Sequence, residues 1–270
     1  MSLPFIVMCA PNGARKSKDD HPGIPLTTDE LADCAESILD AGASIMHVHV
    51  RDDGGGHSLD VARYRAAIDA IRERVGDDLV IQATTEACGI YRPDQQMQVV
   101  RELQPEAVSV ALREICPDES TESRATDFYH WMSAQGVMAQ HILYSTDDLQ
   151  RFASLCEAGV IPDKRPFVLF VLGRYSDNLV GDPAELDALL AESTDAIAWA
   201  VCCFGATEQE AARKAAGSGG HARVGFENNL FLPDGKVAPD NAALVALAAR
   251  SAREYGRSVA SANDVREMLM

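Results

Sequence analysis

Two histidines separated by a single residue are the part of this chain best suited to chemistry. They lie in the run Met46-His47-Val48-His49-Val50-Arg51-Asp52, whose β-branched valines favour a strand. Because side chains at positions i and i+2 leave the same face of a strand, His47, His49 and Arg51 are expected to point together. Two imidazoles about 7 Å apart along the backbone can converge on one metal ion. A third ligand elsewhere in the chain would make this pair a metal site.

A carboxylate near the C-terminus supplies that third ligand. Glu227 lies in the sequence Arg223-Val224-Gly225-Phe226-Glu227-Asn228-Asn229, at the end of an apolar run. Two histidines and one glutamate leave a coordination position open, as catalytic Zn²⁺ sites require. An open Zn²⁺ polarises a carbonyl or activates a water molecule. Alternation places Arg223 on the same side as Glu227, where it would either stabilise a developing oxyanion or form an ion pair.

Alternating strand and helix patterns must position these side chains. Helical spacing with N-terminal capping residues separates the apolar runs, giving about eight strand-helix units, the number that a closed barrel needs. Continuous apolar strands fit a parallel sheet that is covered on both faces. An open doubly wound sheet is the alternative, but no G-x-G-x-x-G follows the first strand. We therefore predict a single (β/α)8 TIM barrel domain over residues 1–270, with a C-terminal helical extension at 263–269. The predicted strands span residues 3–9, 44–50, 79–85, 107–112, 137–143, 167–172, 196–203 and 222–226.

Active sites of closed barrels lie at the C-terminal ends of the strands, and several of these ends carry polar groups. The third predicted strand ends in Thr84-Thr85-Glu86, whose hydroxyls would either bind a substrate carboxylate or terminate the strand. Arg15 belongs to a polar loop with three cations, which is either solvated or a basic patch for a phosphorylated or carboxylated ligand. Cys202 and Cys203 have no basic partner nearby in sequence, so we interpret them as small buried apolar residues.

The charge and cysteine content of the chain limit the partners and the environment that we expect for the protein. The formal net charge of −17 argues against nucleic acid or an anionic membrane surface as a partner. Seven cysteines form no C-x-x-C spacing and no zinc-type cluster, which favours reduced thiols in a cytoplasmic protein. We find no signal peptide, and no apolar run approaches the roughly 20 residues that a membrane span needs.

These motifs together resemble the β-keto acid cleavage enzymes, whose type member acts on 3-keto-5-aminohexanoate. The resemblance runs almost end to end and implies a zinc-bearing (β/α)8 barrel, usually a homotetramer. It implies an acyltransferase that condenses a small β-keto acid with acetyl-CoA, giving acetoacetate and the CoA ester of the shortened acid. The matching segments are Ala10-Pro11-Asn12-Gly13-Ala14, Asp20-His21-Pro22, Ala41-Gly42-Ala43, His47-Val48-His49-Val50-Arg51-Asp52, Arg223-Val224-Gly225-Phe226-Glu227-Asn228-Asn229 and Asp234-Gly235.

The resemblance also implies roles for individual residues. His47, His49 and Glu227 would bind zinc, which chelates the keto and carboxylate oxygens of the substrate. Arg223 matches the catalytic arginine that stabilises anionic intermediates, and Thr84 matches a hydroxyl that contacts the substrate carboxylate.

Three departures from the family pattern concern the substrate and the mechanism. The usual Glu-Asp-Asn reads Glu227-Asn228-Asn229, and an asparagine cannot act as a base near neutral pH. Either another group takes over from the aspartate, or the mechanism differs, or activity is lost. Arg15 stands where the type member uses a glutamate to hold the substrate's amino group, so we expect a neutral or anionic substrate tail. Glu86-Ala87 replaces a Gly-Gly beside the carboxylate pocket.

Two other functions fit parts of the pattern. A metal-dependent hydrolase of the amidohydrolase type also uses a His-x-His strand, but on the first strand, and it needs a later-strand ligand, for which only His141 is suitable. A metal-bearing binding protein without turnover would explain Asn228. Formation of a CoA ester would support the acyltransferase, and hydrolysis without CoA would support the hydrolase. Tight binding without turnover would support the binding protein.

Overall fold

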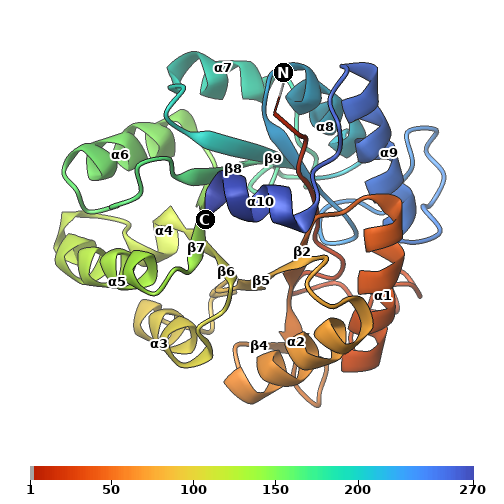
Figure 1. Ribbon diagram of the computed structural model, residues 1–270, viewed down its shortest axis with the longest axis horizontal. Helices are drawn as coiled ribbons and strands as arrows, with labels where there is room; N and C mark the ends of the chain where they lie inside the picture. Colours follow the sequence, from red (N-terminus) through yellow and green to blue (C-terminus); the bar gives the residue numbers. More distant parts are fainter. Residues whose placement is uncertain (1–2) are drawn as a thin grey trace.

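Eight parallel strands close into a barrel in the computed structural model, which describes residues 3–270 (Figure 1). Neighbouring strands follow the order of the chain, and the last strand pairs with the first to complete the ring. The predicted TIM barrel is therefore confirmed. The barrel strands are β1 Val7–Cys9, β2 Ile45–Val48, β5 Val80–Thr84, β6 Ala107–Ala111, β7 Met138–Leu143, β8 Phe167–Leu172, β9 Ala198–Cys203 and β10 His221–Val224.

An outer ring of helices covers the barrel, and local sequence signals explain where they begin and end. In α1, Thr27 and Glu30 form a capping box, and Gly42 ends the helix with a left-handed φ of 108°. The helices are α1 Thr28–Ala41, α2 Val61–Val75, α3 Pro93–Leu103, α4 Leu112–Ile115, α5 Glu122–Ala134, α6 Thr146–Glu157, α7 Glu185–Glu192, α8 Glu208–Gly217 and α9 Asn241–Glu254, with a 3₁₀ turn η1 at Glu119–Thr121. None of the described helices is both long and apolar enough to cross a membrane.

A final helix, α10 Ala262–Leu269, lies across the centre of the ring of helices (Figure 1). Its fully buried Val265 belongs to the same apolar cluster as the first residues of several strands, among them Ile45 and Phe167. Arg266 ties the helix to the barrel through Glu106 at 2.7 Å. The predicted C-terminal extension therefore closes the N-terminal end of the barrel and leaves the opposite end for a site.

The second predicted strand is shorter than expected. It stops at Val48, and the chain then forms a separate hairpin from β3 Val50–Arg51 and β4 His57–Ser58. His49 lies between β2 and β3, and its backbone is hydrogen-bonded by a side chain instead of by a neighbouring strand. Asn12 accepts its N–H at 3.4 Å and donates to its carbonyl at 2.8 Å. Because the Asn12 side chain replaces the hydrogen bonds of a neighbouring strand, the chain can leave the barrel immediately after the histidine pair.

Candidate metal centre

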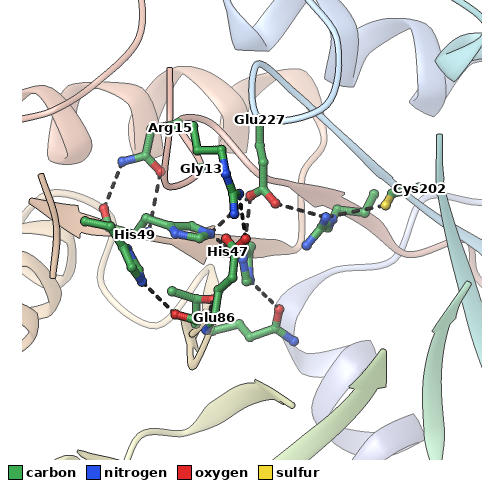
Figure 2. A network of polar contacts seen from close by, with 12 residues as sticks. Gly13, Arg15, His47, His49, Glu86, Cys202 and Glu227 are labelled. Carbon is green, nitrogen blue, oxygen red and sulfur yellow. Dashed lines mark hydrogen bonds and ion pairs between the residues drawn. The ribbon is translucent and has the colours of Figure 1, made fainter. Parts of the chain in front are cut away.

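The side chains of His47, His49 and Glu227 converge at the C-terminal mouth of the barrel (Figure 2). The two Nε2 atoms lie 3.0 Å apart. The carboxylate oxygen Oε2 of Glu227 lies 3.6 Å from the Nε2 of His47 and 3.3 Å from that of His49. Three donor atoms from two chain segments that are far apart in sequence therefore share one small volume, as the sequence motifs predict.

This arrangement fits a divalent metal ion. Ligands bound at about 2.0–2.1 Å to a tetrahedral ion are separated by roughly 3.4 Å, close to the distances between these three atoms. The Oε2 atom of Glu227 is buried and has no hydrogen-bond partner among residues 3–270. A buried carboxylate oxygen without a partner is costly unless a cation completes its environment. The donor set is therefore suited to hold a metal.

His47 is oriented by a neighbouring glutamine. Its Nδ1 lies 2.8 Å from the side-chain oxygen of Gln82, which fixes the proton on Nδ1 and leaves the Nε2 lone pair facing the centre. The amide of Gln82 in turn donates to Gln140 at 3.2 Å. Burial lowers the pKa of His47 to about 3, so the imidazole is neutral and able to coordinate at physiological pH.

Replacement of Gln82 by methionine should weaken metal binding without removing a ligand. Loss of such an orienting hydrogen bond typically costs about 10- to 100-fold in metal affinity. Competition with a chelator of known affinity measures this effect. The matched control is Gln140→Met, which removes a buried glutamine that does not touch His47 and should change the affinity far less. Equal affinities in wild type and Gln82→Met would contradict an orienting role.

The turn that carries Glu227 is held from two sides. On one side, the Gly225 N–H donates to the buried carboxylate of Glu208 at 2.9 Å. On the other side, Lys16 donates to the carbonyls of Phe226 and Glu227 at 2.7 and 2.8 Å. Burial raises the pKa of Glu208 to about 8. Backbone donors and acceptors of one turn are thus satisfied by two side chains from distant segments, which fixes the direction of the Glu227 side chain.

Two glycines permit close approach at the centre. A Cβ added to Gly13, which has φ +61°, would lie 2.6 Å from the Cγ of Glu227. A Cβ added to Gly225, which has φ +131°, would lie 2.5 Å from the carbonyl oxygen of Ala10. Both positions require glycine because a side chain would be strained in the backbone and would displace backbone or ligand atoms.

Gly225→Ala should destabilise the protein by about 2 to 5 kcal/mol, combining left-handed backbone strain with a backbone clash. Urea unfolding measures the free energy. Gly219→Ala is the matched control, because Gly219 has φ +85° but no atom within 4 Å of an added Cβ. The control should lose only about 1 to 2 kcal/mol from backbone strain. An equal loss in both variants would show that the contact with Ala10 does not matter.

Arg223 pairs with the outer oxygen of the carboxylate. Its Nη2 atom donates to Oε1 of Glu227 at 3.1 Å and to the Sγ of Cys202 at 3.4 Å. Burial by itself would raise the pKa of Glu227, but Arg223 and the two imidazoles outweigh it and hold that pKa well below its usual value. The carboxylate is therefore ionised whenever the protein is folded near neutral pH.

Cys202 and Cys203 are buried, as predicted, but the fold gives Cys202 the cationic neighbour that its sequence surroundings lack. Burial raises the pKa of Cys202 to about 11 in spite of Arg223. The thiol is therefore protonated and acts as a packing group that contacts the guanidinium.

A cavity of about 440 Å³ opens above the histidines and Glu227 and includes the other predicted site residues. Thr84 accepts the backbone N–H of Glu86 at 3.0 Å, and Thr85 donates to the carbonyl of Ser109 at 2.8 Å. Arg15 is not a free cation, because it donates to the carboxylate of Glu86 at 2.6 Å. Each of these cavity residues therefore has a local partner as well as access to a ligand.

Asn228, unlike Thr84, Thr85 and Arg15, has no hydrogen-bond partner for its side chain among residues 3–270. Its side chain lines the cavity and the residue is 3% exposed, yet neither its Nδ2 nor its Oδ1 has a hydrogen-bond partner within the described part of the chain. Buried amides are normally paired, and an unpaired one at a cavity wall is available to a ligand.

Two sequence interpretations are not met by the geometry. Arg51 does not line the cavity with the histidines: its Nη2 atom donates to the carbonyls of Gly13 and Lys16 at 2.6 and 2.9 Å. The strand break at His49 ends the regular alternation on which that expectation rested. His141 lies on β7, and its ring packs against Tyr129 of α5 and Phe152 of α6, so it cannot serve as the later-strand ligand of a hydrolase.

Sequence reasoning missed several residues that shape the centre, namely Asn12, Lys16, Gln82, Glu208 and Arg174. Each acts through a contact with a residue distant in sequence. A buried glutamine on a barrel strand is the one local signal, because Gln82 is a polar residue in an otherwise apolar run.

The closed barrel and the three converging donors at its mouth define a TIM-barrel enzyme with a candidate metal centre. The family model for "beta-keto acid cleavage enzyme" matches residues 4–270, and the chain belongs to this family. It is 30% identical to the 3-keto-5-aminohexanoate cleavage enzyme of Acetoanaerobium sticklandii, over 98% of this chain and 97% of the relative. The enzyme of the same name from Fusobacterium nucleatum is 31% identical over 100% and 98%.

A further relative has a different substrate in its name. The 3-oxoadipate:acetyl-CoA acetyltransferase of Cupriavidus necator is 26% identical, over 100% of this chain and 95% of the relative. Among solved structures, apo ObcA superposes with a TM-score of 0.70 at 15% identity and covers 92% of this chain; this chain spans 65% of ObcA. At this identity the likeness concerns the fold alone.

Proposed function

We propose that this protein is a zinc-dependent acyltransferase that exchanges the acyl group of a β-keto acid with that of acetyl-CoA. The observation that carries the proposal is the convergence of His47, His49 and Glu227 at the base of a cavity. The names of the relatives, which include cleavage enzymes and an acetyl-CoA acetyltransferase, support the reaction class. The subunit arrangement we expect is a homotetramer, which light scattering would test.

In the proposed reaction, the bond between C2 and C3 of the β-keto acid breaks and the thioester bond of acetyl-CoA breaks. The acetyl group joins the released two-carbon acid to form acetoacetate, and the remaining acyl group forms a thioester with CoA. Atoms and charges balance without an oxidant, reductant or net proton. The protein must therefore hold two carbonyl groups close together and stabilise the negative charge that develops on their oxygens.

The residues of the cavity suit those tasks. His47, His49 and Glu227 would hold the metal, which supplies a Lewis acid that polarises a carbonyl oxygen. Arg223 adds a fixed positive charge beside Glu227 in a buried setting, where it can stabilise an oxyanion. Thr84 uses its oxygen as an acceptor for Glu86, so its hydroxyl hydrogen is available to a substrate carboxylate.

We assign Asn228 a role in orienting substrate through hydrogen bonds, since it lines the cavity and neither end of its amide has a partner among residues 3–270. An amide neither accepts a proton near neutral pH nor carries charge. Proton handling therefore cannot depend on Asn228, and its oxygen and nitrogen instead suit a donor and an acceptor on the substrate.

Arg15 and Glu86 bear on the tail of the substrate. Their ion pair lies on the cavity wall and offers no unpaired carboxylate to an ammonium group. We therefore propose that the tail of the β-keto acid is neutral or anionic, in contrast to the amino-bearing tail of 3-keto-5-aminohexanoate.

Chelation tests the reaction and its metal together. Incubation of the protein with acetyl-CoA and a panel of neutral, anionic and cationic β-keto acids should produce CoA esters, detected by mass spectrometry. A strong chelator should abolish the products, and added Zn²⁺ should restore them. Hydrolysis of substrates without CoA would instead support an amidohydrolase-type reaction. Binding without any product would support a carrier, and products that persist after complete metal removal would contradict the proposed metal centre.

A further inference from the structure

The cationic side chains that line the cavity differ in how far their hydrogen-bond donors are already used. Lys16 donates to two carbonyls, Arg223 donates to Glu227, and Arg15 donates to Glu86. Arg174 makes no hydrogen bond to any residue of the described chain, although it lines the same cavity. Its donors are therefore available to a ligand.

Two aromatic rings fix the orientation of this guanidinium. The Cζ atom of Arg174 lies 5.7 Å from the ring centre of Tyr175 and 5.9 Å from that of Phe204. Contacts of this kind stabilise a guanidinium without using its N–H groups. The side chain is 25% exposed, so it is held at the wall of the cavity and is only partly solvated.

Arg174 shares its nearest carboxylate with a second guanidinium group. The carboxylate of Glu86 lies 3.8 Å from its Nη2, but the same oxygen is bound by Arg15 at 2.6 Å. Two guanidinium groups thus share one carboxylate. Glu114 also lines the cavity, but its carboxylate is bound by the backbone N–H of Ala87 and the side-chain amide of Gln96, and not by Arg174. Glu86 lies beside His47 and His49 (Figure 2), so the unused N–H groups of Arg174 belong to the same cavity as the candidate metal centre.

A carboxylate is the group that best completes this arrangement. An arginine with free N–H groups binds a carboxylate through two parallel charge-assisted hydrogen bonds. A neutral tail would leave the donors of Arg174 unpaired in a partly buried site, and an ammonium would be repelled. In the proposed reaction the keto and first carboxylate oxygens of the β-keto acid would bind at the metal centre, so the group at Arg174 would be a second one.

We propose that Arg174 selects β-keto acids that carry a second carboxylate at the end of the tail. This inference rests on the proposed β-keto acid cleavage and goes further, because it names the substrate class and the residue that determines it. The group that binds Arg174 would be an anion. The reaction offers two kinds of anion, the second carboxylate of the β-keto acid and the phosphates of CoA. Separate kinetic constants for the two substrates distinguish these sources.

Steady-state kinetics of Arg174→Met test the proposal with 3-oxoadipate as the dicarboxylic substrate and 3-oxohexanoate as its monocarboxylic counterpart. We expect wild type to prefer 3-oxoadipate. In the variant, kcat/KM for 3-oxoadipate should fall about 10- to 100-fold, as expected for lost charge-assisted hydrogen bonds. The value for 3-oxohexanoate and the KM for acetyl-CoA should change less than about threefold, the scale of a contact that carries no charge.

Arg113→Met is the matched control. Arg113 also stacks on Tyr175, with its Cζ 5.3 Å from the ring centre, but it is bound to Asp148 at 2.8 Å and does not line the cavity. The control should keep the preference of the wild type. An equal loss for both keto acids in Arg174→Met would overturn the proposal, as would a wild-type preference for 3-oxohexanoate. A rise confined to the KM of acetyl-CoA would assign Arg174 to the phosphates and would overturn it as well.

A binding measurement keeps this inference separate from the proposed reaction. Calorimetric titration of the metal-loaded protein with adipate and with hexanoate requires no turnover. Tighter binding of adipate in wild type, lost in Arg174→Met and kept in Arg113→Met, would support recognition of the second carboxylate even if no CoA ester forms. Equal binding of adipate by all three proteins would contradict it, whatever the assay for cleavage shows.

Discussion

His49→Ala is expected to lose both the bound metal and the activity. The substitution removes one of three donor atoms that lie 3.0 to 3.6 Å apart, and the remaining pair cannot hold a divalent ion with comparable affinity. Metal content measured by elemental analysis should fall from about one ion per chain to a small fraction, and kcat/KM should fall about 10³-fold or more, because a Lewis acid is worth several kcal/mol.

His130→Ala provides the control for this prediction. His130 is an exposed histidine of α5 in the helical layer, and its one hydrogen bond within residues 3–270 is to the carbonyl of Gly159 at 2.8 Å. It should retain full metal content and activity. If His49→Ala kept a stoichiometric ion and near-normal turnover, the three converging side chains would not form the metal centre, and the proposed function would lose the observation that carries it.

The histidine pair and the distant glutamate could be predicted because two simple regularities determine their placement. Strand alternation brings His47 and His49 to one side, and barrel closure places β10 beside β1, whose other neighbour is β2. The predicted helices and strands deviate mainly at their ends. The break at His49, inside the second predicted strand, depends on Asn12, whose side chain replaces the ladder hydrogen bonds.

The partners of charged side chains could not be predicted in the same way. The sequence indicates that Arg15 is either solvated or part of an anion-binding patch, and the fold pairs it with Glu86, 71 positions away. The availability of Arg174 depends on the fact that Arg15 occupies the same carboxylate. Such outcomes depend on side-chain geometry across several loops, which neither periodicity nor composition encodes.

Arg223→Met is expected to give the second large effect. It removes the guanidinium that pairs with Oε1 of Glu227 at 3.1 Å and leaves a buried carboxylate without its charged partner. Loss of a preorganised group that stabilises developing negative charge lowers kcat by about 10² to 10³-fold. Loss of one partner from a buried ion pair also destabilises a protein by about 3 to 5 kcal/mol, so the variant should be compared with wild type by urea unfolding as well as by activity.

The pH dependence separates these two effects. In wild type, the lowered pKa of Glu227 contributes stability that is present above the unfolded-state value of about 4.3 and is lost as the pH falls through the lower folded value. Without Arg223, burial dominates and the pKa of Glu227 rises. Acid loss of bound metal should therefore begin at a higher pH in Arg223→Met than in wild type.

Arg223→Lys distinguishes a structural role of Arg223, as a counter-charge for Glu227, from a role in stabilising negative charge during the reaction. A lysine keeps a positive charge beside Glu227, so the acid limit of metal binding should return most of the way to that of the wild type. It does not reproduce the planar fork, so kcat should recover only in part. If Arg223→Met lost stability but kept wild-type kcat and the wild-type acid limit, Arg223 would be no more than a buried counter-charge. The stabilisation of anionic oxygen atoms would then have to come from the metal and from Asn228, whose amide nitrogen has no hydrogen-bond partner among residues 3–270.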